Sequence, residues 1–159
     1  MVEFAIVLPI LVALVLGVFS AGLTYNRKNS MANGAREASR YGATLPVANY
    51  PNLTAWLGAV ANVVQKNASG DLDASAPGLR ICVSYVHPAG SLTNDTTLSL
   101  VRTSSGDTTS TSSCYSDGRP DDDERRVQVS VERTSTIEAL LITQQVHLAG
   151  TSTTHFEGL

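Results

Sequence analysis

The side chains of this chain that could do chemistry are few, and their spacing matches no catalytic or metal-binding motif. The three histidines, His87, His147 and His155, are too scattered for a metal site. No HExxH, GxSxG, Walker or GxGxxG motif occurs. We therefore expect no catalysis, no cofactor and no metal site, with the histidines as ordinary surface or strand residues.

An acidic cluster is the only alternative to that expectation. It consists of Asp117, Asp121, Asp122, Asp123 and Glu124. Calcium favours several carboxylates that converge on one point, but the spacing here is not that of an EF-hand. The nearby Arg119, Arg125 and Arg126 offset the charge, so we expect a solvated loop and keep calcium as the alternative.

The two cysteines, Cys82 and Cys114, are far apart in the sequence and neither has a CxxC partner. A structural zinc site is therefore not expected. If the domain lies outside the cytosol, a disulfide between them is the natural interpretation. Two unrelated thiols in a reducing compartment are the alternative. The disulfide would tie the polar segment before Cys114 to the strand that contains Cys82.

Glu3 stands directly before an uncharged segment, Phe4–Asn26, which is followed by Arg27 and Lys28. As a helix this segment would be about 34 Å long, which matches the hydrocarbon thickness of a bilayer. A cleaved secretory signal has a shorter apolar core, so we predict an uncleaved membrane anchor. A carboxylate at this place needs a partner, unless it only favours the helix dipole.

The elements around these residues follow from the hydrophobic pattern. Met31, Ala35, Ala38 and Gly42 share one helical face of small side chains, so one helix should run from Val2 to about Ala43. Pro9 should kink or locally melt its apolar half. A second helix is predicted over residues 52–67, where the apolar stripe is formed by Leu53, Trp56, Leu57, Val60, Val63 and Val64.

Alternating apolar residues predict four strands, over residues 79–85, 96–102, 126–133 and 145–157. The segment 134–144, with Ile137, Leu140 and Leu141, should form a short helical turn or a buried connection. Residues 103–124 should be a long polar loop. We expect an α+β fold in which one face of an antiparallel sheet of about four strands packs on both helices, with Trp56 and Phe156 in the core.

Composition limits the function further. The chain has 159 residues and a net charge of −3, with no cluster of basic residues, so a nucleic-acid partner is not expected. The pattern divides the chain into a membrane half of the first helix, residues 1–26, and a polar globular domain, residues 27–159. That domain contains the amphipathic half of the helix.

Two segments resemble the TadE-like family, the pseudopilins or minor pilins of the tight-adherence branch of type IV pili. They are Val2-Glu3-Phe4-Ala5 with Leu8-Pro9, and residues 35–40, Ala-Arg-Glu-Ala-Ser-Arg. The resemblance covers the first 43 residues and extends weakly to THFE at residues 154–157. It implies a pilin-like fold and assembly through the N-terminal helix, with roles for Glu3, Phe4, Pro9, Ala35, Ala38 and Gly42.

The resemblance also implies partners. A prepilin peptidase would remove a short basic leader, and a membrane assembly platform would extract the helix into a filament of pilin subunits. Glu3 would then pair with a terminal amine, although the glutamate of pilins is usually fifth in the mature chain. Ala35, Ala38 and Gly42 would let neighbouring subunits or the globular domain sit close.

The orientation in the membrane follows from two opposing signals. Arg27 and Lys28 alone would place the end of the anchor in the cytosol, but a lost basic leader would reverse that count. The disulfide and the Ser/Thr-rich domain favour an extracytoplasmic C-terminus. We therefore expect a single-pass protein of the cytoplasmic membrane that enters an extracellular filament. The alternative is an anchored extracytoplasmic binding domain that does not polymerise.

Overall fold

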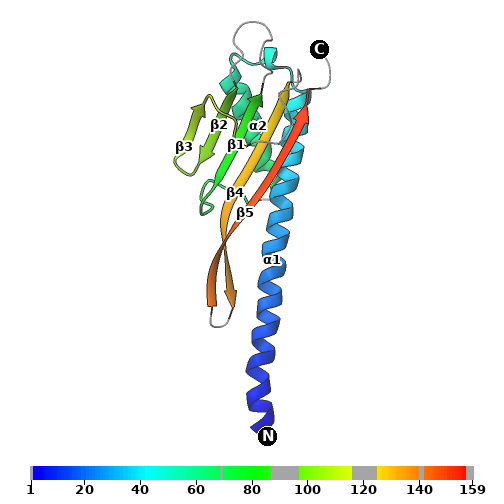
Figure 1. Ribbon diagram of the computed structural model, residues 1–159, viewed down its shortest axis with the longest axis vertical. Coiled ribbons are helices and arrows are strands. Elements are labelled where there is room, and N and C mark those ends of the chain that lie inside the picture. The colour runs from blue at the N-terminus through cyan, green and yellow to red at the C-terminus, as the bar shows by residue number, and fades with distance from the viewer. Residues whose placement is uncertain (1, 69, 87–96, 116–124, 140–141, 157–159) are drawn as a thin grey trace.

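The computed structural model describes residues 2–68, 70–86, 97–115, 125–139 and 142–156. Two helices, α1 and α2, precede five strands, β1–β5, in the described part of the chain (Figure 1). The predicted α+β class is confirmed. The bounds are α1 Val2–Thr44, α2 Leu53–Asn67, β1 Arg80–Val86, β2 Leu98–Thr103, β3 Gly106–Ser110, β4 Arg126–Ala139 and β5 Ile142–His155.

Helix α1 is one long helix, as predicted, and its two halves lie in different environments. Its N-terminal half extends away from the rest of the molecule, and its C-terminal half packs on the domain (Figure 1). The expectation that Pro9 would locally melt the helix is wrong, because the helix is continuous through it. A proline this close to the helix start removes one backbone hydrogen bond, the one to Ala5, and the other turns remain intact.

Helix α2 begins where the sequence predicted. The Asn52 side chain caps it by accepting a hydrogen bond from the Ala55 backbone N–H at 2.8 Å. A short 3-10 turn, Val47–Asn49, connects the two helices. The buried face of α2 is formed by Trp56, Leu57, Val60, Ala61 and Val64.

The described strands form one antiparallel sheet in the order β3-β2-β1-β4-β5. Alternate residues of β1 and β4 face the helices: Ile81 and Val83 from β1, and Val127, Val129 and Val131 from β4, are fully buried. These valines pack with Met31 of α1 and with the apolar face of α2 in one core. The predicted packing of one sheet face on both helices is confirmed.

The predicted strand count of about four is low by one, because β3 lies in the segment expected to be a polar loop. Its sequence is GDTTS, and its side chains are almost all exposed. β3 pairs only with β2 among the described strands and forms the edge of the sheet. An exposed edge strand has no apolar face to bury, so alternation of apolar residues cannot reveal it.

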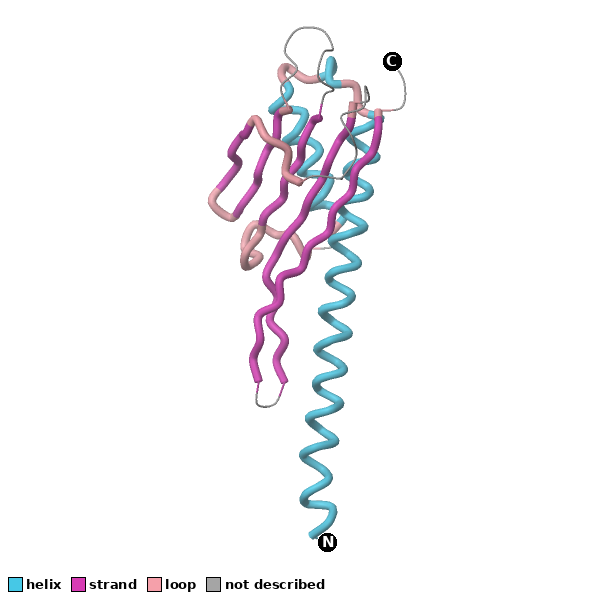
Figure 2. Tube along the Cα trace, in the orientation of Figure 1, coloured by secondary structure: helices cyan, strands magenta, loops and turns pink. Residues whose placement is uncertain are grey.

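The prediction for residues 134–144 is also wrong. β4 continues to Ala139 and β5 begins at Ile142, so Ile137 lies in a strand; Leu140 and Leu141 are outside the described residues. The two strands pair along their whole length, from Arg126 with His155 to Ala139 with Ile142. The resulting β4–β5 hairpin extends beyond the other strands, alongside α1 and toward its N-terminal end (Figure 2).

An aromatic cluster closes the opposite end of the core. Trp56 stacks on Phe156 with ring centroids 6.0 Å apart, and Tyr85 meets both rings edge-on at 5.8 and 5.5 Å. The Trp56 indole N–H donates to the Leu45 carbonyl at 3.2 Å. The prediction that Trp56 and Phe156 belong to the core is therefore confirmed.

Candidate functional site

The N-terminal half of α1 exposes apolar side chains on all sides. Among the described residues, α1 is the one helix long and apolar enough to cross a membrane, by length and composition, and its most apolar stretch is not buried by the rest of the chain. The exposed large side chains include Phe4, Ile6, Val7, Leu8, Ile10, Leu11, Leu14, Val15, Val18 and Phe19. A helix that is apolar all round is stable inside a membrane or inside a protein assembly.

Three of the residues to which the resemblance assigns an assembly role lie in this exposed half. Phe4 is 81% exposed, and Pro9 is exposed as well. Glu3 lies in the first turn of α1, and its side chain is outside what the structure describes. The other three lie in the C-terminal half of the helix, in a different environment.

Ala35, Ala38 and Gly42 lie inside the chain's own core. The side chains of Ala35 and Ala38 are fully buried. A Cβ atom added to Gly42 would lie 3.1 Å from Cγ1 of Val127 and 3.2 Å from Cγ2 of Val60. We expected either neighbouring subunits or the globular domain to pack on this small-residue face. In the structure it is the globular domain that packs on it.

A polar junction, which the sequence did not predict, fixes α1 to the domain at the end of the apolar half. Arg27 donates to the Ser135 hydroxyl at 3.1 Å and lies 3.9 Å from the Asp71 carboxylate. Arg133 of β4 lies 3.5 Å from the same carboxylate and donates to the Asp71 backbone carbonyl. Ser30 donates to the Ala68 carbonyl at 2.9 Å. These contacts hold the helix at the start of its domain-packed half.

The predicted disulfide joins Cys82 of β1 to Cys114, with the Cα atoms 5.8 Å apart. It ties the chain that follows β3 to the sheet face opposite the helices. On that face Ser84 accepts a hydrogen bond from the Cys114 backbone N–H at 3.0 Å, and its hydroxyl lies 2.7 Å from that of Ser99. Ser99 in turn donates to the Ser112 carbonyl. The bridge therefore anchors a strap, residues 111–115, over buried serines.

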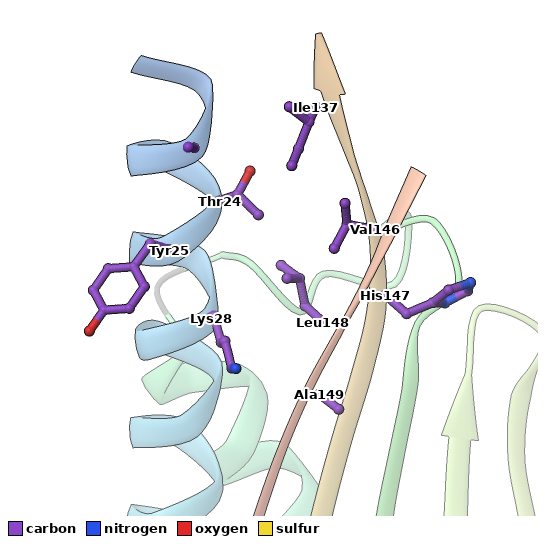
Figure 3. A pocket seen from close by; sticks show the side chains of 9 residues that line it. Thr24, Tyr25, Lys28, Ile137, Val146, His147, Leu148 and Ala149 are labelled. Atoms are coloured by element: carbon purple, nitrogen blue, oxygen red, sulfur yellow. The ribbon is translucent and has the colours of Figure 1, made fainter. Parts of the chain in front are cut away.

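A groove of about 430 Å³ lies between α1 and the β4–β5 hairpin (Figure 3). One wall is the end of the uncharged half of α1, and the other wall is the hairpin at the level of the polar junction. The side chains of Thr24, Ile137, Val146 and Leu148 project into the space between the two elements (Figure 3). Its lining residues are Ala21, Thr24, Tyr25, Lys28, Ile137, Val146, His147, Leu148 and Ala149.

The part of the chain that the structure describes contains no group of three or more His, Cys, Asp or Glu residues that could hold a metal ion. His147 and His155 lie on β5, and His87 is outside the described residues. The acidic cluster proposed as a calcium alternative, residues 117–124, is also outside them.

A bidentate ion pair joins the edge strand β3 to its neighbour β2. Arg102 of β2 contacts Asp107 of β3 through two bonds of 2.8 Å, Nε to Oδ1 and Nη2 to Oδ2. These hydrogen bonds hold the pKa of the Asp107 carboxyl below its ordinary value. The same guanidinium donates to Asn62 and Gln65 of α2, so it links the edge of the sheet to the helix layer.

The model of the family described as TadE-like protein matches residues 1–40. The match confirms the resemblance deduced from the N-terminal motifs, and it covers most of α1 but neither α2 nor the sheet. No curated protein and no solved structure matches the chain.

Proposed function

We propose that this chain, which carries a TadE-like segment over residues 1–40, is a structural subunit of a tight-adherence, type IV-like pilus. It acts as a minor pilin or pseudopilin, or as the main subunit, and it has no catalytic activity. One observation carries the proposal: α1 is half exposed apolar helix and half core helix of a disulfide-bonded domain.

That division suits a subunit that moves from a membrane into a filament. The exposed half is stable in lipid, and the same apolar surface is stable when it is surrounded by the helices of other subunits. The buried half makes the helix a rigid part of the domain, because Met31, Ala35 and Ala38 are fully buried in its core. The domain therefore moves as one unit with the helix. In the filament it would lie outside a core of packed N-terminal helices.

Glu3 has a specific role in this proposal. Its carboxylate enters an apolar environment on assembly, where an unpaired charge is costly. The terminal ammonium of a neighbouring subunit would neutralise it and provide hydrogen-bond donors. Prepilin peptidase and a membrane assembly platform are the further partners, and the disulfide supports an extracytoplasmic domain.

The test compares Glu3→Gln with the matched variant Glu37→Gln, which changes an exposed glutamate of α1 outside the apolar half. Both proteins should reach the membrane fraction at wild-type levels. Glu3→Gln should lose most of the protein found in sheared surface filaments, and Glu3→Asp should restore part of it. Intact mass and N-terminal sequencing of both fractions would show whether filament subunits are processed.

The competing function is an anchored extracytoplasmic binding domain that does not polymerise. It predicts that the chain occurs only in membranes and that Glu3→Gln changes nothing. Wild-type amounts of Glu3→Gln in sheared filaments would reject the role of Glu3, and absence of the wild-type chain from filaments would reject polymerisation.

A further inference from the structure

The far part of the β4–β5 hairpin, residues 136–139 and 142–145, lies beside the segment of α1 that a membrane should hold. Arg27, the first charged residue after the uncharged segment, donates to Ser135. β4 runs four residues past that contact to Ala139, which is about 13 Å at about 3.3 Å per residue. Figure 1 shows that it runs toward the N-terminal end of α1. The far hairpin therefore flanks the last part of the uncharged segment.

The far hairpin is unsuited to hydrocarbon. β1 pairs with β4 only as far as Glu132, so beyond that residue β4 pairs with β5 alone among the described strands. Both outer edges of this two-stranded ribbon carry backbone groups without a strand partner. Open strand edges do not occur in hydrocarbon, because no water is present there to satisfy them. The side chains of Thr143, Gln144 and Gln145 are exposed and polar as well.

With the far hairpin beside α1, the helix cannot span a bilayer at its full length. The uncharged segment is about 34 Å long as a helix, and about 21 Å of it remains beyond the hairpin. The hydrocarbon layer is about 30 Å thick. A bilayer that stops at the hairpin therefore leaves Glu3 inside hydrocarbon, where an unpaired carboxylate is costly. A bilayer that covers the whole segment instead buries the open strand edges.

The far hairpin packs loosely on α1, and the junction behind it packs tightly. The groove of about 430 Å³ separates the two elements, and Ile137 lies across it from Thr24, only partly buried (Figure 3). Closer to the domain Leu148 is buried, and a Cβ atom added to Gly150 would lie 3.1 Å from the Cα atom of Ala32. Opening of the structure at the junction therefore leaves the core intact.

We propose that the far hairpin and the uncharged half of α1 separate while the helix spans a membrane, and pack together once the helix leaves it. Separation lets the whole uncharged segment enter hydrocarbon and keeps the polar strands at the surface. After extraction the hairpin replaces lipid as the cover of Thr24, which is buried in the structure. The inference rests on the membrane anchor of the proposed function and not on filament assembly.

The first test measures the separation in the full chain in nanodiscs, by pulsed electron paramagnetic resonance. Spin labels are attached at Val18→Cys and Gln144→Cys, two exposed positions on α1 and on the far hairpin. The two native cysteines are bonded to each other, so they take no label. Dioleoyl phosphatidylcholine provides a bilayer of ordinary thickness, and dilauroyl phosphatidylcholine provides a thin one. Asn33→Cys with Thr151→Cys, both exposed in the domain, is the matched control.

The distance between positions 18 and 144 should be about 10 Å longer in the ordinary bilayer than in the thin one, since the far hairpin is about 13 Å long. The control distance should not change. Equal distances between positions 18 and 144 in the two bilayers would overturn the proposal. The relaxation of the label at position 18 by oxygen and by a water-soluble nickel complex reports its depth. A label at position 18 that lies in water in both bilayers would reject the anchor itself.

The second test locks the contact. Ala21→Cys and Ile137→Cys, on the two walls of the groove, are joined by a short bis-maleimide. The matched control carries the same two cysteines, each capped with N-ethylmaleimide. In flotation with dioleoyl liposomes, the locked chain should insert several-fold less than the capped chain, and in dilauroyl liposomes the two should insert equally. Equal insertion of both chains into dioleoyl liposomes would show that α1 spans the bilayer with the hairpin in place, and would overturn the proposal.

Discussion

Ala35 and Gly42 lie on the buried face of α1, and their small size sets how closely the helix approaches α2 and β4. The Cβ position of Gly42 is within 3.2 Å of side-chain atoms from both elements. Larger residues at these positions must push the helix away from its own core. An assembly defect in such a variant has to be separated from a folding defect.

Ala35→Leu should lower the free energy of unfolding by about 1–3 kcal/mol, because the site has no room for three further carbons. Asn33→Leu, on the exposed side of the same helix turn, should change it by no more than about 0.5 kcal/mol. Denaturant unfolding in detergent measures both. Unchanged stability of Ala35→Leu together with a loss of filaments would assign the residue to assembly instead.

The Arg102–Asp107 pair should give the domain a small acid dependence. The hydrogen bonds from Arg102 lower the pKa of Asp107 from its ordinary 3.8, so the pair contributes stability above that pH. The contribution is lost as the pH falls through the lowered pKa. Because the pair is partly exposed and screened by water, it is worth about 0.5 kcal/mol.

Asp107→Asn should therefore be slightly less stable than the wild type at pH 7, and the two should converge in acid below the lowered pKa. Thermal unfolding over a pH series measures the difference. Asp73→Asn, in the exposed loop before β1, provides the control. A difference between Asp107→Asn and wild type that persists unchanged in strong acid would show that the effect is not electrostatic.

At the level of elements, the sequence predicted those parts whose side chains alternate between core and solvent. The stripe of α2 gave that helix nearly to the residue, and the alternating valines of β4 gave the start of that strand but not its end at Ala139. β3 was missed because an exposed edge strand buries no apolar face. The far part of the hairpin was missed because Ile137 lies in the run IEALLI, whose apolar residues do not alternate.

The candidate sites also divide into those that the sequence could predict and those that it could not. The disulfide and the small-residue face of α1 follow from residue types and periodicity. The polar junction of Arg27, Asp71 and Arg133 does not, because the three residues lie on elements whose contact is set by the tertiary fold. The groove was unpredictable for the same reason: it needs the hairpin to extend beside the helix.

The disulfide should stabilise the strap over the outer sheet face. It closes a loop with a sequence separation of 32 residues, which corresponds to about 3–4 kcal/mol of chain entropy. Cys82→Ala/Cys114→Ala should lose about that amount in denaturant unfolding, and reductant should destabilise the wild type but not the variant. Equal stability of variant and wild type would mean that the buried serines alone hold the strap.

On the scale of the whole molecule, the structure divides within α1, near Arg27, into an exposed apolar helix and a packed domain. Exposed apolar residues precede it, and the core of the domain begins at Met31. A chain lacking residues 1–26 retains the polar junction and every side chain of the core. Removal of the first 43 residues would also remove the helix face that covers β4 and β5.

The 27–159 fragment should therefore be a soluble, folded monomer with a Tm within a few degrees of the full chain in detergent. The 44–159 fragment should lack a cooperative unfolding transition, because the valines of β4 lose their cover. Size-exclusion chromatography and circular dichroism test both. Aggregation of the longer fragment would show that the apolar half of α1 contributes to the fold.

The contacts of Ser39 have a consequence for how the protein is made. Its hydroxyl lies 2.8 Å from that of Ser152 and 2.9 Å from that of Thr154, residues 113 and 115 positions later in the chain. The first element synthesised, α1, thus obtains these contacts only from the last one, β5. At ordinary translation rates this leaves a delay of about 10 s, during which Ser39 lacks its partners on β5. Ribosome-bound intermediates shorter than β5 should therefore be sensitive to proteolysis within α1, and protection should arrive with the final strand.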